Sequence, residues 1–311
     1  MKLSVEFPSV AYREGPTAVA RLARAIEGIG FDQLDIFDHV VMGYPTQGRG
    51  APIYPPKMPI MEALMTLAYA AAVTERIGLG TEVLVLPQRQ PTLVAKQLAT
   101  LDTLSGGRAR LGVGVGWQAS EYQALGEDFS NRGQRMDEAI QLIRAYWSDA
   151  QVDFQGEFFR ADAMAMEPKP PQGGNLPIWV GGGAPRALKR VGELADGWLA
   201  PAIEAPEQAA RMIEAIRCHA EAAGRDPDRI GLQMMLGMPP RDDAGKGFYG
   251  DPSRVVQRAS QVAEMGFEWI ALNATAIFQA GFRSIDAMTD KLGELHQAIR
   301  AEVGAPPLAA D

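Results

Sequence analysis

Short runs of aliphatic and β-branched residues alternate along the chain with longer segments whose apolar positions recur at helical spacing. The predicted strands cover residues 3–7, 33–37, 77–86, 109–115, 178–180, 197–199, 230–236 and 269–272. The predicted helices cover residues 16–29, 60–74, 91–104, 132–147, 185–194, 206–223, 252–265 and 285–303. Repeated strand–helix pairs force parallel pairing, and eight of them at this length favour a closed (β/α)₈ barrel over an open sheet.

Two segments interrupt this alternation. Residues 148–176 predict a small β-excursion with a Pro/Gly-rich return, inserted between the fourth helix and the fifth strand. Residues 40–59 form a long loop rich in glycine and proline, which either covers an active site or is a disordered insertion. Because no linker or shift in composition divides the chain, we expect residues 1–311 to form a single barrel domain.

Composition and charge exclude several classes of protein. The chain is 47% hydrophobic and 22% charged, and 30 basic against 38 acidic residues give a net charge of −8 without a basic block. A nucleic-acid or membrane surface is therefore not expected, because both require a basic face. Cys218 is the only cysteine, so it forms no intrachain disulfide. Glu6 and Pro8 interrupt the apolar stretch that a signal peptide needs, so we expect a cytoplasmic protein.

Asp38 and His39 stand at the predicted end of the second strand, where a barrel places its ligands. The other two histidines, His219 and His296, fall in predicted outer helices. His39 is therefore either a general acid or base at the site, or a loop residue bonded to the backbone. A metal site is not predicted, because no further histidine or carboxylate ligands stand at other strand ends.

Two glycine clusters also lie at predicted strand ends. In residues 111–116 glycines alternate up to Gly116, so one strand face is open to a flat ligand or to a neighbouring backbone, or simply fits the barrel interior. Trp117 follows, either flanking a ring system or packing in the core. Gly181, Gly182 and Gly183 precede a helix start with Arg186 in its first turn, which favours an anion-binding turn over a plain tight turn.

Other chemistries lack their sequence signatures. The glycine turn has no P-loop lysine, so hydrolysis of nucleoside triphosphates is not indicated. The chain contains no G-x-S-x-G motif, which argues against a nucleophile-elbow hydrolase.

Taken in order, several segments resemble the luciferase-like oxidoreductase family of (β/α)₈ proteins. That family includes flavin-dependent monooxygenases and enzymes that use the deazaflavin coenzyme F420. The segments that carry the resemblance are residues 91–108, 111–117, Glu121-Tyr122, Leu125-Gly126, Arg132-Gly133, Asp137-Glu138, 177–182 and 195–198. The predicted insertion at residues 148–176 also resembles one that is usual in the family.

The resemblance implies a cofactor ring across the C-terminal mouth of the barrel, with its phosphate-bearing tail at Gly181–Gly183. It implies a non-proline cis peptide between Glu82 and Val83, although small or hydroxyl side chains are commoner than Glu82 there. The positions that match cofactor-lining residues of relatives are Gly116, Trp117 and Ser120.

Asp38-His39 resembles the Asp-His pair of deazaflavin-using members of the family. This resemblance implies that His39 serves as acid/base or ring-positioning group and that Asp38 orients it. Deazaflavin enzymes that act on sugar phosphates have a glutamate where this chain has Trp117, which implies a different proton relay and a different substrate.

Four functional hypotheses follow. The Asp-His pair favours hydride transfer between F420 and a small organic substrate. The first alternative is a monooxygenase that receives reduced FMN from a separate reductase and inserts oxygen from O₂ in a closed site. The others are a non-catalytic flavin-binding barrel and a metal-dependent barrel hydrolase or lyase. The resemblance also makes a homodimer the expected assembly.

Overall fold

The computed structural model describes residues 1–237 and 247–304 of the chain. Its main sheet is a closed parallel barrel, because β5 pairs with β3 as well as with β4 and so joins the two ends of the strand order. The strands are β1 (Lys2–Glu6), β2 (Gln33–Ile36), β3 (Gly78–Thr81), β4 (Leu84–Val85), β5 (Ala109–Gly114), β8 (Ile178–Gly181), β9 (Gly197–Ala200), β10 (Gly231–Met235) and β11 (Trp269–Asn273). The predicted (β/α)₈ barrel is confirmed.

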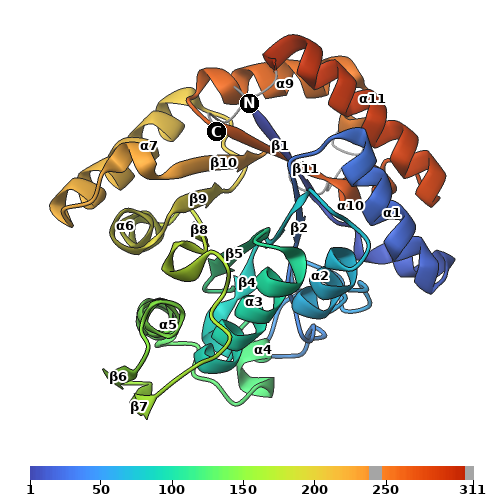
Figure 1. The fold of residues 1–311 in the computed structure, drawn as a ribbon. Coiled ribbons are helices and arrows are strands. Elements are labelled where there is room, and N and C mark those ends of the chain that lie inside the picture. Colours follow the sequence, from blue (N-terminus) through green and yellow to red (C-terminus); the bar gives the residue numbers. More distant parts are fainter. Residues whose placement is uncertain (238–246, 305–311) are drawn as a thin grey trace.

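Helices surround the strands, as Figure 1 shows. They are α1 (Pro16–Ile29), α2 (Ala63–Ala71), α3 (Pro91–Ser105), α4 (Ala119–Ala124), α5 (Arg132–Ser148), α6 (Pro185–Leu194), α7 (Pro206–Ala222), α9 (Pro252–Glu264), α10 (Ala274–Gln279) and α11 (Ile285–Val303). No helix in the described ranges is both long and apolar enough to cross a membrane.

Local sequence explains the limits and packing of these helices. In α1, Val19, Leu22 and Ile26 recur at helical spacing and are buried against the barrel. Full burial of each of the two larger side chains contributes about 1.5–3 kcal/mol. In α3, Pro91 occupies the first turn and Gly106 ends the helix in the left-handed conformation, as the sequence predicts.

Two predicted elements differ from the structure. The third strand is divided into β3 and β4, and the Glu82–Val83 peptide between them is cis, as the resemblance implies. The second helix begins at Ala63 rather than at residue 60, because the side chain of Glu62 caps it by accepting the Met65 N–H.

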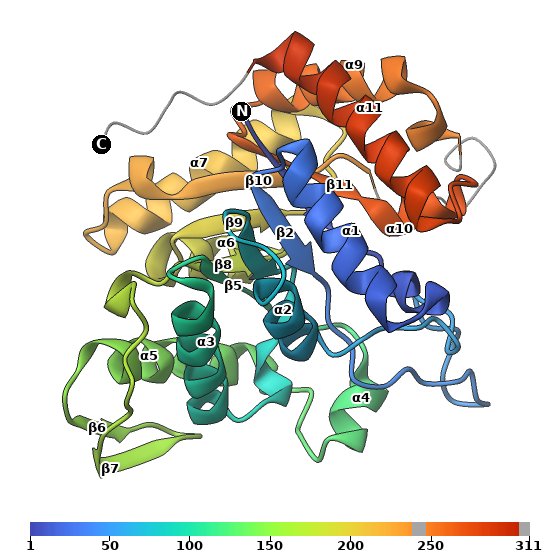
Figure 2. The ribbon, with the colours of Figure 1, turned by 45° about the vertical axis from the view of Figure 1, so that its right-hand side comes forward.

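Residues 148–176 contain an antiparallel hairpin of β6 (Val152–Gln155) and β7 (Arg160–Met164), separate from the barrel sheet. In both views it lies beyond α5, at the outer edge of the molecule (Figures 1 and 2). The carboxylate of Glu138 on α5 accepts the N–H groups of residues 157–159 and so fastens the hairpin turn to the helix.

The barrel strands alternate apolar side chains toward the helices with polar side chains toward the interior. The inward polar side chains include Ser4, Glu6, Gln33, Asp35, Arg110, Gln233 and Asn273, all buried. Arg110 on β5 bonds to Gln233 on β10 and to Asp35 on β2, which are not neighbouring strands of β5, so these bonds cross the interior. The barrel therefore encloses a polar network.

Candidate active site at the mouth of the barrel

His39 follows β2 at the C-terminal end of the barrel and is 7% exposed. Its Nδ1 lies 2.9 Å from Oε2 of Glu121, a residue in the first turn of α4. The second oxygen of Glu121 accepts the backbone N–H groups of Val40 at 2.6 Å and Val41 at 3.3 Å. One buried carboxylate thus holds both the imidazole ring and the chain that follows it.

The charge of Glu121 decides how the ring can act. Burial alone would raise the pKa of Glu121, but the hydrogen bond and charge of His39, with contributions from Gln88 and Val40, outweigh burial and lower that pKa. An ionised Glu121 can only accept a hydrogen bond, so Nδ1–H is the donor and Nε2 of the neutral ring carries the free lone pair. No group in the described ranges bonds to Nε2, so this nitrogen is available to a ligand.

Asp38, expected to orient His39, contacts other groups instead. Its carboxylate accepts hydrogen bonds from Arg89 at 2.8 Å and from the Val85 N–H at 3.1 Å. Burial raises the pKa of Asp38, with Arg89 partly opposing the shift. The orienting contact therefore comes from Glu121, a residue that the sequence pattern does not single out as part of the site, although the Glu121-Tyr122 segment is part of the resemblance.

An aromatic cluster covers the imidazole. The ring centroids of His39 and Trp117 lie 5.2 Å apart, and Tyr54 lies 5.7 Å from His39 and 6.1 Å from Trp117. Tyr54 belongs to the loop of residues 40–59. Gln118 binds the start of that loop, because its side chain accepts the Gly43 N–H and donates to the Val41 carbonyl. The loop therefore packs over His39, as a covering segment would.

The alternating glycines of β5, and Gly116 just after it, make room for protein rather than for a ligand. A Cβ added at these positions would collide with the segment that contains β3 and β4. The closest approaches are 1.8 Å from Gly112 to the Thr81 carbonyl oxygen, 2.6 Å from Gly114 to Val83 and 2.6 Å from Gly116 to Val85. Of the interpretations open from sequence, the structure supports close approach of neighbouring backbone and side chains.

The second glycine cluster is also partly used for packing. A Cβ at Gly181 would lie 2.7 Å from Val83, and Gly182 adopts φ +118 with its carbonyl bonded to the Trp198 indole. The amides of Gly183 and Ala184, however, donate to nothing in the described part of the chain. They precede α6, which has no side-chain cap and no acidic residue in its first turn. This turn meets the requirements of a phosphate site.

Beneath the mouth, two carboxyl groups occupy the barrel interior. Glu82 accepts a hydrogen bond from Gln233 at 2.9 Å, and Glu6 accepts one from Asn273 at 2.9 Å. Burial and the charge of Asp35 raise the pKa of Glu6 to about 8. Burial, followed by the charges of Asp35 and Glu6, also raises the pKa of Glu82, against the opposing effect of Arg110. Glu82 therefore points into this network.

Two side chains beside Glu121 have buried polar atoms without a hydrogen-bond partner in the described ranges. Ser120 Oγ and both amide atoms of Gln88 complete no hydrogen bond of good geometry within the described ranges, although the Gln88 amide lies close enough to Glu121 to lower its pKa. Buried polar atoms of this kind are costly unless a ligand or water satisfies them. Together with the phosphate turn, they fit a bound cofactor or substrate at this mouth.

Within the described residues, no group of three or more His, Cys, Asp or Glu side chains has the geometry to hold a metal ion.

Comparison with known proteins places these features in a family. The sequence profile described as "luciferase-like monooxygenase" matches residues 3–243. An F420-dependent glucose-6-phosphate dehydrogenase of Nocardia farcinica is 32% identical over 243 residues, which cover 75% of this chain and 68% of that protein. An uncharacterised protein of Mycobacterium tuberculosis is 35% identical over 212 residues, covering 66% and 72% of the two chains.

Solved structures share the fold at lower sequence identity. The structure of an F420-dependent secondary alcohol dehydrogenase in complex with an F420–acetone adduct superposes with a TM-score of 0.77 at 21% identity, covering 96% of this chain and all of the other. The monooxygenase RslO1 from Streptomyces bottropensis gives a TM-score of 0.72 at 22% identity, with 94% and 98% coverage.

Proposed function

The chain belongs to the luciferase-like monooxygenase family of oxidoreductases, and we propose that it uses the deazaflavin F420 to exchange a hydride with a small organic substrate. The His39–Glu121 pair carries this proposal, because it provides a fixed imidazole with an available Nε2 at the mouth of the barrel. The similarity to an F420-dependent dehydrogenase supports the choice of cofactor.

The residues of the mouth suit this role. Trp117 lies beside His39, and we propose that Gly116 and Ser120, which stand near it in the chain, also border the cofactor. Val83 lies between β5 and β8, against Gly114 and Gly181. The turn of Gly181–Gly183 and Arg186 would hold a phosphate. Glu82 would contribute its peptide to the floor of the site, since its carboxyl group is bonded to Gln233.

The proposed chemistry needs one side chain that can accept a proton from the substrate and return it. When bound, the deazaflavin supplies a two-electron hydride donor or acceptor. His39 Nε2 takes the proton that leaves an oxidised substrate, or returns it in the reverse direction. Glu121 stabilises the imidazolium that forms, because it is ionised and hydrogen-bonded to Nδ1. Trp117 and Tyr54 shield this proton transfer from water.

A second candidate is FMN-dependent monooxygenation with a separate reductase. The position of Tyr54 over His39 and Trp117 favours it, since oxygen chemistry on a reduced flavin needs a site closed to water. The two candidates use the same mouth, and they differ in the cofactor form that the protein should prefer.

Parallel titration with F420 and FMN, each oxidised and reduced, separates these candidates through quenching of tryptophan fluorescence. F420 should bind at least tenfold more tightly than FMN; a preference for reduced FMN would favour the monooxygenase, and binding of neither would overturn both. His39→Asn should retain F420 binding and lose turnover, whereas His219→Asn on α7 should change neither. Loss of turnover with intact binding in His39→Asn would reject a non-catalytic flavin-binding barrel, which predicts that cofactor affinity and any slow oxidation stay unchanged.

We also propose a cytoplasmic homodimer that obtains its reduced cofactor from a separate reductase. Four large apolar side chains on the neighbouring helices α2 and α3 support a subunit interface there: Met65, Tyr69, Leu93 and Leu104 are all exposed. Sedimentation of wild type and of Met65→Glu should show a dimer that the substitution weakens. A monomeric wild type would contradict the proposed assembly.

A further inference from the structure

Three inward carboxyl groups lie together at the top of the barrel interior, directly beneath the mouth. Glu6 is the last residue of β1, and Glu82 is the first residue after β3. Asp35 on β2 is the register partner of Glu6, so both side chains point to the same face of the sheet. We call Glu6, Asp35 and Glu82 the carboxyl layer.

The carboxyl layer has more acids than cations. Arg110 forms an ion pair with Asp35 at 2.6 Å, whereas Glu6 and Glu82 accept hydrogen bonds from side-chain amides. The second oxygen of each of these two, Glu6 Oε2 and Glu82 Oε1, has no hydrogen-bond partner in the described ranges. Burial and the neighbouring carboxyl charges raise the pKa of both groups. Two carboxyl groups therefore lack a cation to balance them.

Two further buried groups beside these acids have unused hydrogen-bonding capacity. Ser4 stands two residues before Glu6 on the same face of β1, and its fully buried Oγ has no partner within the described residues. The Tyr249 hydroxyl accepts the Asn273 N–H at 3.0 Å but donates its own proton to no described group. Burial and the charges of Glu6 and Glu82 raise the pKa of this hydroxyl, which therefore lies close to both acids. Such groups indicate that a ligand or water completes the site.

The carboxyl layer also adjoins the space around His39. Glu6 and Glu82 are 6% and 9% exposed, so the layer is not sealed from the mouth above it. Burial and the charge of Glu6 raise the pKa of Tyr54 to about 12. The ring of Tyr54 lies 5.7 Å from the ring of His39. A small molecule beneath the loop of residues 40–59 can therefore meet both Glu6 and His39.

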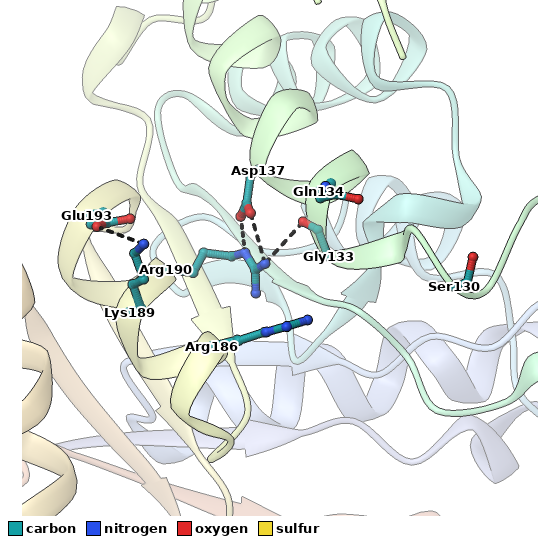
Figure 3. A pocket seen from close by; sticks show the side chains of 8 residues that line it. All are labelled: Ser130, Gly133, Gln134, Asp137, Arg186, Lys189, Arg190 and Glu193. Atoms are coloured by element: carbon teal, nitrogen blue, oxygen red, sulfur yellow. Dashed lines mark hydrogen bonds and ion pairs between the residues drawn. The ribbon is translucent and has the colours of Figure 1, made fainter. Parts of the chain in front are cut away.

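Positive groups lie on the opposite side of the barrel. Four strand pairings separate β1 from β8 through β11, β10 and β9, and four separate them through β2, β3 and β5. β8 leads into the proposed phosphate turn and α6. Figure 3 shows Arg186, Lys189 and Arg190 extending from α6, where the Arg190 guanidinium bonds to Asp137. A phosphate group and a positively charged substrate would thus occupy opposite sides of one mouth.

We propose that the carboxyl layer is a substrate subsite for a small organic cation, whose ammonium group binds to Glu6 and Glu82 while its reacting carbon faces His39. The inference rests on the proposed hydride exchange and names the class of its substrate, an alcohol or carbonyl compound that carries an amine. The ammonium group takes no part in the transfer. In the oxidation, the hydride passes from the carbinol carbon to the deazaflavin, and the hydroxyl proton passes to His39 Nε2.

Isothermal titration calorimetry with benzylammonium and benzyl alcohol tests the subsite, because these probes have nearly the same shape and differ in charge. Wild type should bind benzylammonium about tenfold or more tightly than benzyl alcohol at about pH 8, as a charge-assisted contact allows. The preference should shrink toward about pH 6.5, because the proton of Glu6 then competes with the ammonium group. Titration in buffers of different ionisation enthalpy should detect the proton that is released on binding.

The other groups around Glu6 do not obscure this response. Asp35 is already in an ion pair. The raised pKa values of Tyr54 and Tyr249 keep both hydroxyl groups neutral over this pH range. The pKa of Glu82 is also raised, so its carboxyl group adds to the response in the same direction. The pH dependence therefore reports on the two acids that the subsite uses.

Glu6→Gln and Glu82→Gln should each weaken benzylammonium binding by about three- to tenfold and leave benzyl alcohol binding unchanged. Glutamine can still accept the amide hydrogen bonds that Glu6 and Glu82 receive, so both variants should fold. Glu6→Gln should also remove most of the proton release. Glu268→Gln is the matched control, since Glu268 is an exposed carboxylate before β11, at the other end of the barrel. It should change neither dissociation constant.

Equal affinities of wild type for the two probes, or a preference that persists in both Glu6→Gln and Glu82→Gln, would overturn the cation subsite and leave the proposed function standing. Failure of F420 to bind in the cofactor titration would instead overturn the proposed function, whatever the two probes show.

Discussion

Glu121 at the mouth and Glu6 in the barrel interior are both buried carboxyl groups, yet their pKa values shift in opposite directions. Glu121 accepts hydrogen bonds from His39 and from the N–H groups of Val40 and Val41. Glu6 accepts one bond, from Asn273, and lies near the charge of Asp35. The number of donors and the sign of the nearest charge thus decide which buried acid ionises.

The difference separates two roles at one end of the barrel. The mouth contains an ionised carboxylate that orients His39, the group that we propose for proton transfer. The interior contains Glu6 and Glu82, whose pKa values are raised by burial and by neighbouring carboxyl groups, and Glu6, with a pKa of about 8, retains its proton at neutral pH. Single substitutions can alter the mouth or the interior separately. Their expected effects decrease from Arg110 in the interior to Gln88 at the mouth.

Arg110→Met should cause the largest loss. It leaves Asp35 without its ion-pair partner and removes the guanidinium that stacks 4.5 Å from the Trp179 ring centroid. We expect the free energy of unfolding to fall by about 3–5 kcal/mol, as for other broken buried pairs. Urea denaturation measures it. Asp35→Asn combined with Arg110→Met should recover part of the loss, whereas a loss below about 1 kcal/mol for the single variant would show that the network is not structural.

Glu121→Gln should mainly affect turnover. The neutral amide cannot stabilise an imidazolium at His39, so we expect kcat to fall by about a hundredfold or more. Binding of the cofactor should change little, since Glu121 acts through His39. Steady-state kinetics and fluorescence titration of the same protein separate the two effects. Glu127→Gln, which alters a partly buried ion pair with Arg135, is the control and should leave kcat as in wild type.

Glu6→Gln should change how stability depends on pH. In the folded protein Glu6 keeps its proton up to about pH 8, whereas in the unfolded chain it ionises near its ordinary pKa of 4.5. Wild type therefore loses stability as pH rises through this interval, and a glutamine does not. Relative to wild type, the variant should gain about 1–3 kcal/mol between pH 5 and pH 9.

Denaturation at several pH values measures this gain. Glu302→Gln on the exposed end of α11 should show no such trend. A difference between Glu6→Gln and wild type that stays constant with pH would mean that Glu6 is ionised in the folded protein.

Gln88→Leu should have the smallest effect on stability. Since the Gln88 amide completes no hydrogen bond of good geometry, its replacement should change the free energy of unfolding by less than about 1 kcal/mol. Ligand binding should weaken by about two- to tenfold if the amide serves a ligand. Gln118→Leu is the contrast, because it breaks two bonds to the loop and should destabilise the protein. An effect on stability larger than that of Gln118→Leu would contradict this interpretation.

Much of the fold follows from neighbouring residues. The alternation of strand and helix patterns predicts the barrel, and Pro91 and Gly106 mark the limits of α3 within one residue. His39 is found by its place after a strand, because parallel strands bring their carboxyl ends to one face. The resemblance adds the cis peptide after Glu82. These features depend on local periodicity and on motifs that are continuous in the chain.

Other features depend on groups that meet only when the barrel closes. The partner of His39 is Glu121, 82 residues away, while the adjacent Asp38 turns to Arg89. The polar alternation in β1 and β2, which includes Glu6 and Asp35, signals an unusual interior, but pattern alone does not say which of these acids ionises. That outcome depends on Arg110 crossing from β5 and on how many donors each carboxyl group receives. Local periodicity determines which face of an element is buried, whereas barrel closure determines which distant charges and donors meet on that face, and with them the protonation state of each buried acid.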